Sequence, residues 1–183
     1  MSVDFRFALS DNTNMKAPPL LPEETLIRVL RVARLDGMSV LVIAGVFALI
    51  SAMAGDFVGA VVGLLVAGAG AVELHGATLL EHCEPRGMRW LVGSQIFLLA
   101  TVVAYCGLRL LHPVLDPLQA AVTDEMKVSL EAAGWKQEEF IRFVYNTTYY
   151  LVGAVTVFYQ GGMAIYYLRR REPVARALAE DVE

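Results

Sequence analysis

Residues 57–80 read FVGAVVGLLVAGAGAVELHGATLL, an apolar run with a single carboxylate, and this stretch decides the fold class. A helix needs about 20 mostly apolar residues to cross the hydrocarbon layer of a bilayer. Inside lipid every backbone N–H and C=O needs an internal partner, so a run of this length must be helical. The sequence therefore predicts a transmembrane helix over residues 57–80.

Residues 38–54, 90–111 and 143–168 are apolar runs of the same kind, so the chain is predicted to cross the membrane four times. Of the 183 residues 56% are hydrophobic and 19% charged, whereas soluble domains carry about a quarter charged residues. We therefore expect an all-α integral membrane four-helix bundle, with spans one to three within residues 38–111 and span four at 143–168. The net charge of −4 gives no sign of a nucleic-acid partner.

The segment before the first span is basic and amphipathic. Within residues 22–37, Arg28, Arg31 and Arg34 recur every three positions among apolar side chains, which is typical of a helix lying at a membrane surface. A plain extension of the first spanning helix explains the pattern equally well. Asp36 is expected to pair with a neighbouring arginine.

The remaining segments lie outside the predicted spans. We expect cytoplasmic tails at residues 1–21 and 169–183 and an acidic outer connection at residues 112–142. Apolar residues about every four positions predict a single extramembrane helix over 117–133, which Gly134 can end.

Lysines and arginines set the predicted orientation. Of the 15 in the chain, only Arg109, Lys127, Lys136 and Arg142 lie in or beside the outer connection. All others lie before span one, in the turn at residues 82–89 or after span four, where Arg169, Arg170 and Arg171 are consecutive. Because basic residues stay in the cytoplasm, both termini are predicted to be cytoplasmic, facing anionic lipid headgroups.

Small residues mark one face of the second span. Gly59 and Gly63 form a GxxxG pair that continues to Gly70. Such residues let two helix backbones approach closely in lipid. They predict close packing, either within the bundle or between the subunits of a homo-oligomer.

A polar layer is predicted in the cytoplasmic half of the spans. Glu73, Gln95 and Gln160 each lie about five residues from the centre of their span, which places them at one depth, with Ser94 beside them. A carboxylate at that depth costs several kcal/mol unless it is protonated, paired or hydrated. One interpretation is a water-lined path or ligand site around Glu73, and the other is hydrogen bonding that only holds helices together.

No motif for catalysis or for a cofactor occurs in the sequence. GxSxG, P-loop and HExxH patterns are absent, and no cluster of Cys and His suggests a metal site. We therefore expect no catalytic residues, no metal and no cofactor. The leading hypothesis is an oligomeric channel- or transporter-like membrane protein. The alternative is a membrane scaffold or sensor that binds a partner protein through its acidic outer helix.

Overall fold

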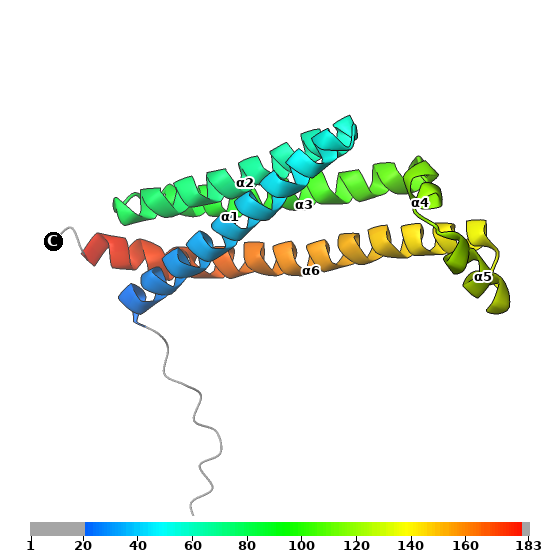
Figure 1. Cartoon of the computed structure of the whole chain (residues 1–183). Helices are drawn as coiled ribbons and strands as arrows, with labels where there is room; N and C mark the ends of the chain where they lie inside the picture. The colour runs from blue at the N-terminus through cyan, green and yellow to red at the C-terminus, as the bar shows by residue number, and fades with distance from the viewer. Residues whose placement is uncertain (1–20, 181–183) are drawn as a thin grey trace, which may run out of the picture.

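The computed structural model describes residues 21–180, and these residues form helices and no strand (Figure 1). The predicted tail at residues 1–21 falls almost entirely outside the described residues, as do residues 181–183. Four helices are long and apolar enough to cross a membrane. They are α1 (Pro22–Met53), α2 (Phe57–Glu81), α3 (Gly87–Leu111) and α6 (Gln137–Glu180).

The bundle has two different ends (Figure 1). At the end that we call the closed end, the start of α1, the turn at residues 82–86 and the last turns of α6 lie together. At the opposite end, the open end, lie the α1–α2 turn and two short helices, α4 (Asp116–Ala120) and α5 (Asp124–Ala132). α1 begins beside α6 at the closed end and leans away from it toward the open end.

α1 is one uninterrupted helix of 32 residues. Pro22 occupies its first turn together with Glu23 and Glu24, which suits the positive end of the helix dipole. Of the two alternatives for residues 22–37, the structure has the extension of the first apolar segment. A separate amphipathic helix before span one is not formed, because nothing in the sequence between Pro22 and Met53 breaks the helix.

The glycine face of α2 packs against α1 of the same chain. A Cβ atom at Gly63 would lie 2.8 Å from the Cβ of Ala48, and one at Gly70 would lie 2.8 Å from the carbonyl oxygen of Gly37. Gly59 is similarly enclosed beside Ser51. These contacts take up the glycine face within the bundle, so it is not available as a contact between subunits.

The outer connection differs from the single helix predicted over residues 117–133. α4 ends at Ala120, and α5 starts afresh at Asp124 because the Thr123 hydroxyl accepts a hydrogen bond from the Met126 amide at 3.4 Å. This N-cap competes with continuation of the first helix. Gly134, with φ of 77°, ends the segment as expected.

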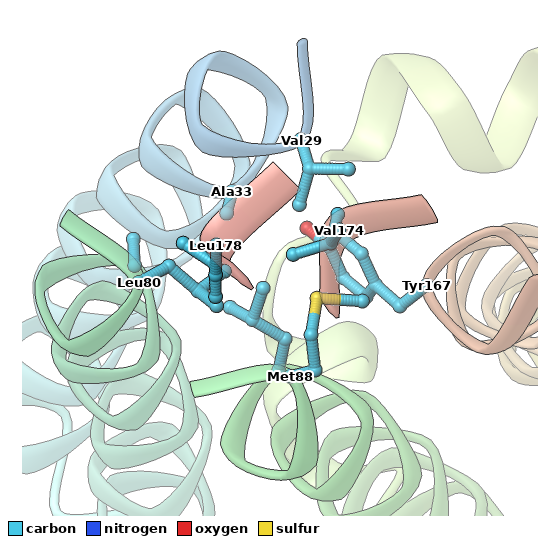
Figure 2. Close-up of a cluster of buried hydrophobic side chains, with 9 residues drawn as sticks. Val29, Ala33, Leu80, Met88, Tyr167, Val174 and Leu178 are labelled. Atoms are coloured by element: carbon cyan, nitrogen blue, oxygen red, sulfur yellow. The ribbon is translucent and has the colours of Figure 1, made fainter. Parts of the chain in front are cut away.

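α6 extends beyond the predicted fourth span at both ends and continues through Pro173 to Glu180, so residues 169–180 of the predicted tail are helical. Its last turns belong to the apolar core at the closed end (Figure 2). There Val174 and Leu178 of α6 meet Val29 of α1, Leu80 of α2 and Met88 of α3. This packing explains why the helix continues past the proline, which removes one backbone hydrogen bond.

Candidate functional site

Glu73 lies in the middle of the bundle and is 1% exposed. It shares the buried face of α2 with Gly70 and Ala77, which follow the helical spacing of three and four residues. The hydroxyl of Tyr167 on α6 donates a hydrogen bond of 2.6 Å to Glu73 Oε1. Tyr167 is itself fully buried beside the core. α2 and α6 are therefore joined through a carboxylate.

Asp36 is a second buried carboxylate and connects three helices. The Gln95 amide on α3 donates to Asp36 Oδ2 at 2.9 Å, and the Tyr159 hydroxyl on α6 donates to Oδ1 at 2.8 Å. The expected local pair of Asp36 with an arginine is wrong, because Arg34 instead pairs with Glu81 on α2. Asp36 points into the bundle on the face that also carries Val29 and Ala33.

Asp36 and Gln95 are near neighbours of the Glu73 carboxyl group. The set forms one buried polar group, which we call the carboxylate cluster and which consists of Asp36, Glu73, Gln95, Tyr159 and Tyr167. All its hydrogen-bond donors are neutral. Within residues 21–180, neither carboxylate forms an ion pair with an arginine, lysine or histidine.

The cluster holds more hydrogen-bond acceptors than donors. The Gln95 side-chain oxygen is buried and has no hydrogen-bond partner among the described residues, and the same holds for the Gln160 oxygen. Two adjacent carboxylates add their own unused lone pairs. Such a site is completed by a proton on the carboxylate pair or by a small cation that prefers oxygen ligands. The part of the chain that the structure describes has no group of three or more His, Cys, Asp or Glu that could hold a metal ion.

The four residues of the predicted polar layer take different places. Glu73 and Gln95 belong to the cluster. Gln160 is buried, but the hydrogen bond to Asp36 comes from its neighbour Tyr159. Ser94 is buried and donates to the Leu91 carbonyl oxygen of its own helix at 2.9 Å.

A second polar site lies at the open end, around Arg109. This arginine, near the end of α3, forms an ion pair with Asp56, the N-cap of α2. Its Nε also donates to the Tyr105 hydroxyl at 3.1 Å. The Tyr145 hydroxyl donates to the Arg109 carbonyl oxygen at 3.1 Å, which ties α3 to α6. Arg109 and Asp56 line a cavity of about 750 Å³ together with Tyr145 and Tyr149.

The predicted basic residues gather at the closed end. Arg28, Arg31 and Arg169 are exposed, and the guanidinium of Arg170 lies 4.6 Å from the centre of the Tyr166 ring. Arg171 lines a smaller cavity beside the α2–α3 turn.

No family model, no curated protein and no solved structure matches this chain.

Proposed function

We propose that the chain crosses a cell membrane four times, with its closed end on the cytoplasmic side. Large apolar side chains support insertion, because they cover the outside of the long helices: Phe57 is 78% exposed and Phe158 is 82% exposed. Water would strongly disfavour such a surface, whereas lipid favours it. The basic residues at the closed end support the orientation.

We propose further that the carboxylate cluster binds a small cation, in the first place a proton, and that the protein acts as a channel or transporter for it. The observation that carries this proposal is the burial of Asp36 and Glu73, which are near neighbours and accept hydrogen bonds from neutral donors alone. Two negative charges in a low-dielectric interior repel each other and lack the solvation of water. Binding of one positive charge relieves the repulsion and leaves a single negative charge for the neutral donors to stabilise.

The position of the cluster suits passage of an ion. It joins α1, α2, α3 and α6, so a change in its charge alters contacts among all four long helices at once. Ionisable residues within spans are typical of proton relays and ion pathways. Within the cluster, the Gln95 carboxamide contacts one carboxylate and neighbours the other, which allows it to respond to the loss or gain of a cation.

The test is proton flux into liposomes that contain the purified full chain and a pH-sensitive dye. Glu73→Gln keeps the shape of the side chain and removes its charge, so we expect loss of at least nine-tenths of the flux. Glu125→Gln is the matched control, because Glu125 is an exposed carboxylate in α5, and it should leave the flux unchanged. Wild-type flux in a correctly folded Glu73→Gln protein would refute the assignment to the cluster.

A membrane scaffold or sensor is the second candidate function. It is favoured by the exposure of α4 and α5, which contain no buried residue and present Met126 and Val128 to the surroundings. The test is co-purification of a partner protein with the chain. Binding that persists in the Glu73→Gln variant and is lost on deletion of residues 117–133 would support this function instead. Homo-oligomerisation stays a prediction, and its contact would have to use a face other than Gly59, Gly63 and Gly70.

A further inference from the structure

A cavity of about 310 Å³ lies at the closed end, between the α2–α3 turn and the last turns of α6. Three arginines from two distant parts of the sequence line it: Arg86, Arg89 and Arg171. The other lining residues are Pro85, Met88, Val174 and Ala175. The lining therefore combines strong positive charge with an apolar surface and contains no carboxylate.

The three arginines are not paired with a carboxylate among residues 21–179, whose side chains the structure describes. None of them forms an ion pair there, whereas Arg34 and Arg176 at the same end pair with Glu81 and Glu172. Three guanidinium groups around one small cavity repel one another unless an anion joins them. The arrangement is thus complementary to a ligand with at least one negative charge.

The backbone adds to the positive potential. α3 begins at Gly87 beside this cavity, and no side chain caps its first turn. The start of a helix 25 residues long carries partial positive charge that favours an anion, although the Gly87 and Arg89 N–H groups already donate to the Glu84 and Arg86 carbonyl oxygens. This contribution supplements the arginines, which carry the site.

The floor of the cavity is firmly held. Met88 is 2% exposed and Val174 is fully buried, and both pack in the apolar core at the closed end (Figure 2). The floor therefore cannot shift without disturbing that core. The arginine side chains stand around it and are exposed.

We infer that this cavity binds a phosphate group. Arginine is the side chain best suited to phosphate, because its planar guanidinium offers two parallel N–H donors to two phosphate oxygens. The phosphate can belong to an anionic lipid headgroup, since basic pockets at the ends of spanning helices hold such headgroups, or to a soluble phosphate. The site is separate from the carboxylate cluster and does not depend on cation binding there.

The test is the thermal unfolding midpoint of the purified full chain in neutral detergent, titrated with phosphatidylglycerol, with phosphatidylcholine or with inorganic phosphate. We expect phosphatidylglycerol to raise the midpoint more than phosphatidylcholine at equal concentration. Arg89→Gln and Arg171→Gln should each require about ten times more phosphatidylglycerol for the same rise, because each removes a charge-assisted hydrogen bond. Arg169→Gln is the matched control, since it removes the same charge two residues from Arg171 and outside the cavity.

The outcomes separate the two sources of phosphate and can overturn the inference. An arginine-dependent rise with inorganic phosphate as well as phosphatidylglycerol indicates a site for free phosphate, and a rise with phosphatidylglycerol alone indicates a lipid site. If Arg169→Gln weakens the effect as much as Arg171→Gln, the charge of the whole end is responsible and the site is refuted. Equal effects of the two lipids, with no effect of phosphate, also refute it. Arg171→Lys serves as a second variant if Arg171→Gln unfolds.

Discussion

Two polar sites of the bundle hold their carboxylates in opposite ways. In the middle of the bundle, Asp36 and Glu73 are 6% and 1% exposed and accept hydrogen bonds from neutral donors alone. At the open end, Asp56 has 36% of its side chain exposed, borders a large cavity and is paired with Arg109. The charges of an ion pair offset each other, whereas two buried carboxylates need a proton or another cation to offset their charge. The cation site that we propose therefore involves the buried carboxylates and not the ion pair that borders the large cavity.

The largest expected effect on the free energy of unfolding comes from the difference in side-chain burial between the closed end and the open end. Leu91→Ala removes a fully buried side chain from the closed-end core, and we expect it to lower the free energy of unfolding by about 3 kcal/mol. Leu118→Ala is the matched substitution at the open end, where Leu118 is 37% exposed and lines the large cavity. It should cost less than about 1 kcal/mol. Reversible unfolding in mixed micelles, followed by circular dichroism, measures both, and equal losses would contradict the distinction between the ends.

Loss of the ion pair at the open end should have the next largest effect on the free energy of unfolding. Arg109→Gln leaves Asp56 and Tyr105 without their partner, and we expect a loss of about 2 kcal/mol, between the values for exposed and buried pairs. Glu73→Gln should instead leave stability near that of the wild type, because the glutamine oxygen can still accept the Tyr167 hydrogen bond.

A double-mutant cycle with Asp56→Asn isolates the pair at the open end. The double variant should recover about 1 kcal/mol relative to the sum of the single losses. Additivity of the two losses to within about 0.5 kcal/mol would show that Arg109 acts through packing rather than through Asp56.

The long helices could be predicted from the sequence, because four apolar runs of sufficient length impose them. The hydroxyl of Thr123, a local competitor, ended the predicted outer helix early. A signal for Asp36 was present in its spacing from Val29 and Ala33, which places it on the same buried face of α1. Because the apolar run of the first span begins at residue 38, Asp36 lies outside the predicted span and outside the predicted polar layer.

The contact from Tyr159 rather than Gln160 shows what sequence cannot supply. Successive residues on a helix point about 100° apart, since a turn holds 3.6 residues. The depth of a residue in the membrane can therefore be predicted from its position in the sequence. The rotation of α6 about its axis, which turns Tyr159 toward Asp36, depends instead on how α6 packs against its neighbours. Depth along the helices predicts that Glu73 and Gln95 lie near each other, whereas the rotation of α6 decides which of its residues donates to Asp36.

The smallest expected effect concerns a third kind of carboxylate, fully in solvent on α5. Lys127 donates a hydrogen bond of 2.7 Å to Asp124, and this neighbour lowers the pKa of the Asp124 carboxyl below its ordinary value. A lowered pKa in the folded state means that the contact adds stability above the ordinary pKa and loses it as the pH falls through the lowered one. Lys127→Gln should therefore raise the pKa of Asp124 toward its ordinary value, as measured by carboxyl NMR titration, and Lys136→Gln should leave it unchanged. A detectable change in flux from Lys127→Gln would contradict the separation of this exposed pair from the buried cluster, because a pair in water is screened by salt within about 10 Å.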